Sequence, residues 1–257
     1  MKFLRNIWRG FKGFFPWYAR LYKGRPWYTK TAVGIMSAIV AFFLYLGMVD
    51  INFLWLFGKT PGFMEIQEPP TFAASEIYSS DGKLIGKYFK ENRSPVQFGQ
   101  VNPIFWKALV DTEERFYSHH GVDFLGLGGA LKDALFHSGA RGASTITQQL
   151  AKNMFGMRSQ VSTGLLGKIP GVRMLIMKSK EWIVATKLEM VYSKQEILTM
   201  YANTVDFGNN SYGIMTASKT YYGCKPNELT PDQCATLVGM LKATTSYNPI
   251  SHPKNSR

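Results

Sequence analysis

The sequence predicts a mainly α-helical domain preceded by one transmembrane helix and a short β-hairpin. Three observations lead to this fold class. Residues 31–49 carry no charged side chain, apolar residues recur with a helical period from Asn102 onward, and helix-capping patterns begin at Thr145, Ser193 and Thr230. Disorder is excluded because 46% of the residues are hydrophobic and only 18% are charged.

The first 57 residues are interpreted as a basic tail and a membrane anchor. Residues 1–49 hold eight Lys or Arg and no acid, and the 19 residues 31–49 are uncharged, close to the ~20 that cross a hydrocarbon core. Trp27, Tyr28 and Trp55 flank the run, and such rings favour the headgroup level. We predict a cytoplasmic tail over 1–30, an anchor over 31–57, and the rest outside. A cleaved signal peptide is the alternative, but its apolar region would be shorter.

Charge and cysteine content exclude other classes. The net charge is +13, but it is concentrated in the N-terminal tail, whereas a nucleic-acid-binding surface needs basic residues clustered on the folded domain. We therefore expect no nucleic-acid partner. Cys224 and Cys234 are too few for a disulfide framework, and we expect two small, semi-buried side chains.

Between the anchor and the helical region, two short segments are predicted. Residues 58–74 are rich in proline and glycine and are interpreted as a linker. Asp81-Gly82 then separates two strand-like runs within residues 75–89, which is typical of a hairpin turn. The main domain is predicted over residues 75–257.

The first helix of that domain should begin at Pro103, capped by Asn102. Phe105 and Leu109 fall on one face, and Glu113 lies at the edge of that face. A carboxyl group against apolar side chains can be tuned for proton transfer. Glu114 points away and is interpreted as a surface charge.

The stretch "RGASTITQQLAKN" (residues 141–153) predicts an unusually polar helix capped by Ser144 or Thr145. Gln148 and Lys152 share a face with Ser144, and Gln149 lies beside them. Such a face suits a neutral, hydroxyl-rich ligand such as a sugar, with Lys152 and the helix N-terminus available to an anion. The alternative is a well-capped surface helix without a ligand.

A second acidic group comes from residues 177–203. Lys178, Lys180 and Glu181 precede a long helix there. Two carboxylates from separate helices can carry out chemistry at a sugar carbon, and the amines would face a phosphate. The adjacent His119 and His120 are weak evidence for a metal site, because no third ligand lies at close spacing.

Five ordered motifs resemble those of the family 51 glycosyltransferases, the peptidoglycan polymerase domain of class A penicillin-binding proteins. They are "TEERFYSHHGVD" (112–123), "GASTITQQLAKN" (142–153), "KSKE" (178–181), "EILTMYANTVDFGNNSYGIMTASKTYYG" (196–223) and "LTPDQCATLVGMLKATTSYNP" (229–249). The resemblance implies a lysozyme-like fold on the outer face of the bacterial cytoplasmic membrane. It also implies lipid II and the nascent glycan strand as substrates, and other cell-wall synthesis proteins as partners.

By this resemblance, Glu113 is the general base and Glu181 the second carboxylate, with a divalent cation (Mg or Mn) at the pyrophosphate. The substrate-binding residues would be Ser144, Thr145, Gln148, Gln149, Lys152, Asn153, Lys178 and Lys180. Residues 154–177 resemble the family's mobile, membrane-dipping subdomain; their alternative interpretation is a long loop.

Three departures from the family pattern bear on activity. Only two residues separate Glu113 from Phe116, one fewer than the pattern, so alignment on Phe116 puts the catalytic position at Thr112 and alignment on Thr112 puts it at Glu113. The third motif has Met177 where an arginine is usual. The sequence stops at Arg257, which suggests the N-terminal part of a bifunctional protein. A non-catalytic lipid II binder is the alternative function, and a lysozyme-like hydrolase is disfavoured by the anchor and lysines.

Overall fold

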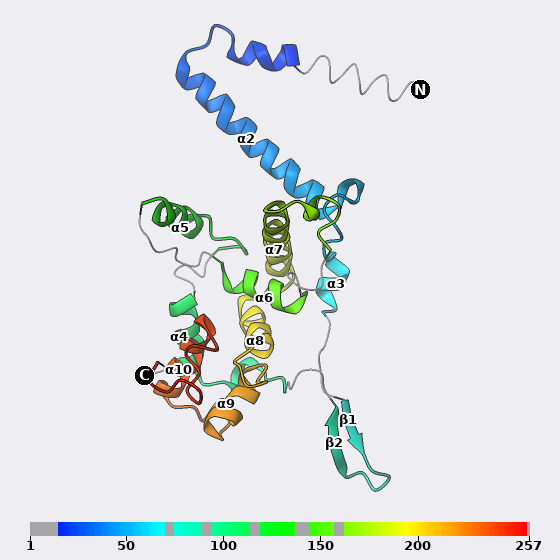
Figure 1. Cartoon of the computed structure of the whole chain (residues 1–257), viewed down its shortest axis with the longest axis vertical. Coiled ribbons are helices and arrows are strands. Elements are labelled where there is room, and N and C mark those ends of the chain that lie inside the picture. The colour runs from blue at the N-terminus through cyan, green and yellow to red at the C-terminus, as the bar shows by residue number, and fades with distance from the viewer. Residues whose placement is uncertain are drawn as a thin grey trace.

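The computed structural model describes residues 15–69, 75–88, 94–113, 119–136, 144–156 and 162–255 (Figure 1). The prediction of a mainly helical chain is confirmed. The named elements are α2 (Trp27–Asp50), η1 (Phe53–Trp55), α3 (Phe63–Gln67), β1 (Ser75–Tyr78), β2 (Leu84–Tyr88), η2 (Phe98–Gln100), α4 (Pro103–Glu113), α5 (Phe124–Phe136), α6 (Ile146–Met154), η3 (Leu166–Lys168), α7 (Val172–Val191), α8 (Lys194–Thr204), α9 (Ile214–Tyr222) and α10 (Pro231–Lys242).

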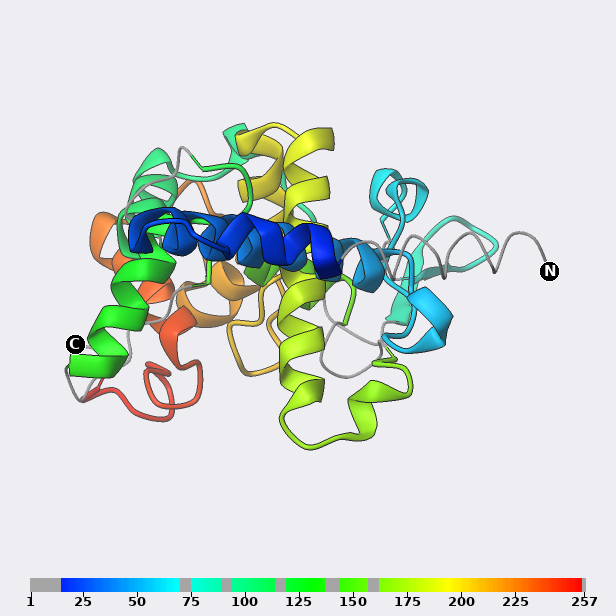
Figure 2. The same ribbon diagram turned by 90° about the horizontal axis from the view of Figure 1, so that it is seen from above.

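Helix α2 is long and apolar enough to cross a membrane, and it is the one such helix in the described part of the chain. It projects from the helical body in Figure 1 and passes over that body in Figure 2. The helix ends at Asp50, seven residues before the predicted end of the anchor at residue 57. The physical reason is local: Asn52 takes a left-handed conformation with φ 50°, which an asparagine tolerates and an α-helix does not.

The prediction of a linker over residues 58–74 is wrong for residues 58–69. This segment contains α3, which packs against α7, and Ile66 of α3 is completely buried. The hydroxyl of Tyr192 donates a 2.8 Å hydrogen bond to the carbonyl of Ile66. Proline and glycine interrupt the helical pattern of this segment, which is why the sequence favoured a linker. The burial of Ile66 nevertheless attaches the segment to the domain. Residues 70–74 lie outside the described part.

Strands β1 and β2 flank the Asp81-Gly82 turn and pair antiparallel, with Ser75 opposite Tyr88. Gly82 has a φ of 77°, which a glycine adopts without steric cost. In Figure 1 the pair extends away from the helices at the end of the molecule opposite α2. The hairpin therefore lies far from α2.

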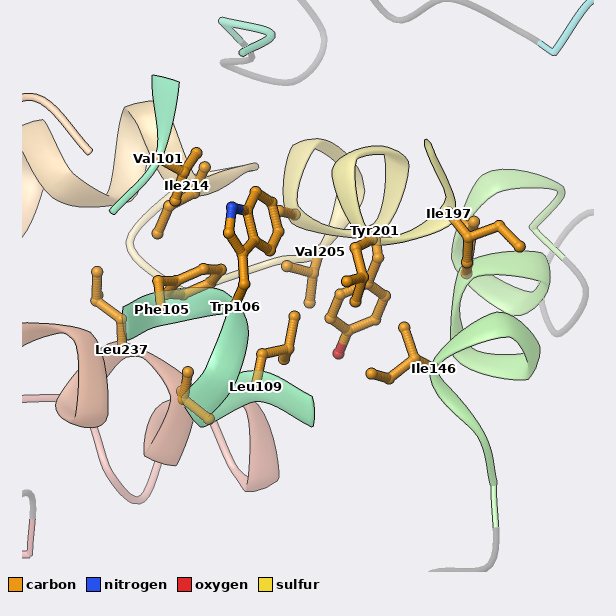
Figure 3. Packing of buried hydrophobic residues seen from close by; sticks show 14 of the residues in the cluster. Val101, Phe105, Trp106, Leu109, Ile146, Ile197, Tyr201, Val205, Ile214 and Leu237 are labelled. Carbon is orange, nitrogen blue, oxygen red and sulfur yellow. The ribbon is translucent and has the colours of Figure 1, made fainter. Parts of the chain in front are cut away.

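One hydrophobic core joins α4, α6, α7, α8, α9 and α10. Helix α6 packs against both α7 and α8, and α10 packs against α4. Figure 3 shows Tyr201 reaching from α8 into the space between Leu109 of α4 and Ile146 of α6. Phe105 and Leu109 are completely buried, so the predicted apolar face of the first helix is confirmed.

The predicted helix caps are confirmed as well. The side chains of Thr145, Ser193 and Thr230 each accept a hydrogen bond from the backbone N–H three residues later, and Asn102 accepts one from Ile104 at the start of α4. These contacts satisfy N–H groups that the first turn of a helix leaves without partners. Cys224 is half-buried and Cys234 is buried.

A second, smaller hydrophobic cluster joins the membrane helix to the domain. Its buried members are Val49 of α2, Phe57 and Ile176 of α7. Tyr45 packs edge-on against Phe57 with ring centroids 5.9 Å apart. The membrane helix is thereby packed directly on α7.

Candidate active site

Helix α6 is the polar helix that the sequence singled out, and most of its polar side chains face inward. Thr145 caps the helix by accepting a 3.1 Å hydrogen bond from the backbone N–H of Gln148. The side chain of Gln148 does not return to the cap. It is 1% exposed and points toward α7, so the helix presents its amides to neighbouring elements rather than to bulk solvent.

Gln148 and Ser144 meet the start of α7 at Lys178. The Lys178 ammonium donates hydrogen bonds of 2.9 Å to Ser144 Oγ, 3.0 Å to Gln148 Oε1 and 2.7 Å to Glu181 Oε2. Glu181 is 3% exposed, while the Lys178 side chain keeps 29% of its surface. The carboxylate is therefore buried, whereas the lysine side chain that pairs with it is partly exposed.

The neighbouring amide, Gln149, serves the other predicted carboxylate. Its Nε2 donates a 2.6 Å hydrogen bond to Glu113 Oε2, and its Oε1 accepts a 3.1 Å hydrogen bond from the Tyr201 hydroxyl. Glu113 is the last described residue of α4 and is half-buried. Tyr201 thus sets which way the Gln149 amide is turned, and the amide orients Glu113.

The site uses one group that the sequence did not reveal, the carbonyl of Gly121. It accepts hydrogen bonds from Thr145 Oγ1 at 2.9 Å and from Gln148 Nε2 at 3.2 Å. Gly121 has a φ of 84°, and a Cβ there would lie 2.8 Å from the backbone of Ala185 in α7. Only glycine allows the backbone of α7 to come this close. The glycine of the first motif was thus a sequence signal for this contact.

These contacts bring together, around α6, the carboxylates and the amides that the sequence had placed in three separate motifs. The profile of the family described as "Transglycosylase" matches residues 81–257, a span that includes all of them. The chain belongs to the transglycosylase family.

Curated relatives agree with this assignment. Penicillin-binding protein 1A of Haemophilus influenzae is 38% identical over 213 residues, which cover 82% of this chain and 22% of that protein. Penicillin-binding protein 1A of Escherichia coli is 34% identical over 84% of this chain and 24% of its own length. Penicillin-binding protein 1F of Bacillus subtilis is 34% identical over 87% and 29%. The chain thus spans less than a third of each of these relatives.

A crystal structure of the H. influenzae protein aligns with 73% of this chain and 17% of its own, at 22% identity and a TM-score of 0.36. We draw nothing about the fold from this overlap. The lysozyme-like architecture stays a prediction.

Not all of the predicted site residues lie beside Glu113, Glu181 and Lys178. Lys152 and Asn153 are half-buried at the C-terminal end of α6. Lys180 is 1% exposed, and its ammonium binds three backbone carbonyls, those of Gly58, Lys59 and Ser162. The prediction that Lys180 faces a phosphate is therefore wrong: two positions along a helix turn a side chain by about 200°, away from Lys178.

Several predictions fall on residues that the structure does not describe. Glu114 and Phe116 lie in the gap 114–118, so the shortened spacing of the first motif stays untested.

Glu189 is a described carboxylate of the transglycosylase domain that the sequence did not single out. Its side chain is 4% exposed and receives hydrogen bonds from Thr147 at 2.6 Å and Lys194 at 2.7 Å, which ties α6 to the end of α7.

The described residues do not form a divalent-cation site by themselves. Among them, no three His, Cys, Asp or Glu side chains lie together, and Glu181 is already paired with Lys178. Magnesium is often held by one or two carboxylates together with substrate phosphates.

A pocket of about 550 Å³ lies beside the start of α7, and its lining combines basic and apolar side chains. Lys168 and Arg173 line it together with Met174 and Met177. Nearby Ile169 is half exposed at 50%. This pocket lies in the segment predicted to contact the membrane, of which residues 157–161 are not described.

Proposed function

We propose that the chain is a membrane-anchored peptidoglycan glycosyltransferase. It polymerises lipid II into β-1,4 glycan strands and releases polyprenyl pyrophosphate. The observation that carries this proposal is the pair of hydrogen-bonded carboxylates on either side of α6: Glu113 bound by Gln149, and Glu181 bound through Lys178 to Gln148 and Ser144. Membership of the transglycosylase family and the similarity to penicillin-binding proteins support it.

Glu113 is proposed as the general base. It takes the proton from the acceptor sugar's 4-hydroxyl as that oxygen forms a bond to the anomeric carbon of the donor. The bond between the anomeric carbon and the pyrophosphate oxygen breaks, its electron pair leaves with the pyrophosphate, and the anomeric configuration inverts. The hydrogen bond from Gln149 orients the carboxylate but occupies only one of its oxygens, so the other is available for the proton.

Lys178 is proposed to receive the leaving group. Its side chain keeps 29% of its surface, and charge-assisted hydrogen bonds from an ammonium stabilise phosphate oxygens. A phosphate oxygen would replace one of the two neutral acceptors of the ammonium, Ser144 Oγ or Gln148 Oε1. The buried Glu181 holds that ammonium at the mouth of the site and sets its position on the donor side. Ser144, Lys152 and Asn153, which are half-buried, form the proposed substrate surface. The buried Thr145 and Gln148 support it from within the domain.

The proposed location is the bacterial cytoplasmic membrane, with α2 as the single span, the basic N-terminus in the cytoplasm and the site outside. The packing of α2 on α7 supports a site held close to the membrane surface. The proposed partners are the nascent glycan strand and other cell-wall synthesis proteins.

The test is polymerisation of labelled lipid II by the detergent-solubilised chain and its Glu113→Gln variant. Loss of a general base costs about 10²–10⁴-fold in rate, so we expect glycan from the parent and almost none from Glu113→Gln. Glu114→Gln, a matched change at the adjacent carboxylate, should retain the parental rate. Lipid II binding without polymerisation by the parent would instead favour a non-catalytic binder.

A further inference from the structure

Lys180 stands out because it is a lysine in the interior of the domain. Its relative exposure is 1%, and burying a charged group is costly unless hydrogen bonds compensate for the lost hydration. Three carbonyls surround the ammonium, at 2.9 Å for Gly58, 2.8 Å for Lys59 and 2.8 Å for Ser162. Each of the three ammonium hydrogens therefore has one acceptor.

The three carbonyls come from two segments far apart in the sequence. Gly58 and Lys59 belong to the exit of the membrane helix, and Ser162 belongs to the loop before η3. Lys180 itself lies in α7. We call these residues, with Leu56 and Gly164, the anchor junction.

The two loops of the anchor junction approach each other at two glycines. A Cβ on Gly58 would lie 2.1 Å from the carbonyl oxygen of Ser162, and one on Gly164 would lie 2.4 Å from that of Leu56. Backbone hydrogen bonding continues the contact, since the Leu166 N–H donates to the Leu56 carbonyl at 3.0 Å. The Lys180 ammonium thus binds carbonyls of both loops at a place where their backbones also contact each other directly.

Helix α7 carries the anchor junction and the candidate active site on opposite faces. Ile176, Lys180 and Lys187 recur at spacings of four and seven, which places them on one side of a helix. That side meets α2, where Ile176 packs on Val49 and Lys187 pairs with Asp50. Lys178 and Glu181, on the far side, face α6.

We propose that Lys180 is a positioning residue that locks the membrane helix and the loop before η3 to α7. It thereby holds the Lys178–Glu181 face at a set height and tilt above the membrane, where a lipid-linked donor arrives. The inference rests on the proposed function for the identity of that donor. Burial lowers the pKa of Lys180 to about 8, so at neutral pH the amine is mostly protonated and can donate all three hydrogen bonds.

The discriminating experiment compares two forms of one substrate. The first is long-chain lipid II embedded in phosphatidylethanolamine–phosphatidylglycerol vesicles that hold the full chain. The second is a short-chain, water-soluble analogue offered to the same vesicles. Lys180→Met keeps the length of the side chain but leaves three carbonyls without a donor.

We expect Lys180→Met to lower kcat/KM for the embedded substrate by about tenfold or more, since misplacement by ~1 Å can cost up to ~10²-fold. Turnover of the soluble analogue should stay near the parental value, because the analogue reaches the site at any height. Lys83→Met, the same change at an exposed lysine of the hairpin turn, should leave both substrates unaffected.

A second variant guards against a folding defect in Lys180→Met. Gly164→Ala breaks the anchor junction without touching α7, because its Cβ meets backbone at 2.4 Å. Gly62→Ala is the matched control, since a Cβ there meets nothing within 4 Å. Gly164→Ala should reproduce the selective loss on embedded substrate.

The geometry can be measured without any turnover. Nitroxide labels at Tyr28→Cys in α2 and Ala235→Cys in α10, in a chain with Cys224 and Cys234 replaced by alanine, report the distance from anchor to domain. Double electron–electron resonance should give a narrow distribution of label-to-label distances for the parent and a broader one for Lys180→Met and Gly164→Ala.

Equal loss on both substrates, or no loss on either, would overturn the proposal, as would unchanged distance distributions. If the parent turns over neither substrate, the proposed function fails, while the distance distributions still decide whether Lys180 locks the anchor junction.

Discussion

At the scale of single residues, the two adjacent amides of α6 divide the work between two carboxylates. Consecutive residues of a helix point about 100° apart, so Gln148 turns to Lys178 and Glu181, while Gln149 turns to Glu113 and Tyr201. A pair of neighbouring glutamines is therefore a compact way to orient two groups from different helices.

Lys180 gives a prediction about pH. Burial lowers its pKa from 10.5 to about 8, so between these pH values the unfolded chain binds more protons than the folded chain, and the free energy of unfolding should rise with pH. Urea unfolding of the detergent-solubilised parent and Lys180→Met at pH 8, 9 and 10 measures this. The difference in stability between the parent and the variant should grow in favour of the parent over this range.

Lys83→Met serves as the control for that series, because Lys83 is exposed. Its difference from the parent should not change with pH. A constant difference for Lys180→Met as well would mean that the buried amine titrates at its ordinary pKa.

At the scale of elements, α6 depends on its first turn. Thr145 both caps the helix and donates a hydrogen bond to the buried Gly121 carbonyl. Thr230 is an equivalent cap on α10, but it is exposed. The two threonines therefore separate the effect of capping from the effect of a buried hydrogen bond.

We expect Thr145→Ala to lower the free energy of unfolding by about 2 kcal/mol and Thr230→Ala by about 1 kcal/mol. The first figure combines a cap, worth ~1 kcal/mol, with the loss of one of the two hydrogen bonds to the buried Gly121 carbonyl, worth roughly 0.5–1.5 kcal/mol. Chemical denaturation followed by circular dichroism measures both. Equal losses would show that the remaining hydrogen bond from Gln148 Nε2 satisfies the Gly121 carbonyl by itself.

At the scale of the whole molecule, α2 and the domain form one packed unit through the cluster of Val49, Phe57 and Ile176. The proposed orientation puts the domain outside the cytoplasm, α2 across the membrane and the basic N-terminus inside. Juxtamembrane basic residues favour the cytoplasmic side, and all eight Lys or Arg of residues 1–49 precede the uncharged run.

Single cysteines test this orientation in intact cells. In a chain with Cys224 and Cys234 replaced by alanine, a membrane-impermeant thiol reagent should label Lys225→Cys on the exposed surface of the domain. Lys23→Cys should be labelled only after the cytoplasmic membrane is permeabilised. Labelling of Lys23→Cys in cells whose cytoplasmic membrane is intact would contradict the proposed topology.

What could be predicted from sequence alone follows from local chemistry. The caps at Thr145, Ser193 and Thr230, and the burial of Phe105 and Leu109, depend on residues within a few positions of one another, so the pattern carries them. The uncharged run of α2 is equally local. The carboxylates and amides of the site were also found, because ordered motifs mark them.

The remainder depended on contacts between distant segments. The partners of Lys180 are 122, 121 and 18 residues away, and no local pattern distinguishes it from Lys178. Ile66 of α3 packs against the core, so this segment is part of the domain although the sequence predicted a linker there. The sequence alone determined which residues could do the chemistry and where α4, α6, α8 and α10 begin. Tertiary packing decided which lysine meets Glu181 and which binds the loop after α2, because a buried charge is tolerated only where the fold supplies its acceptors.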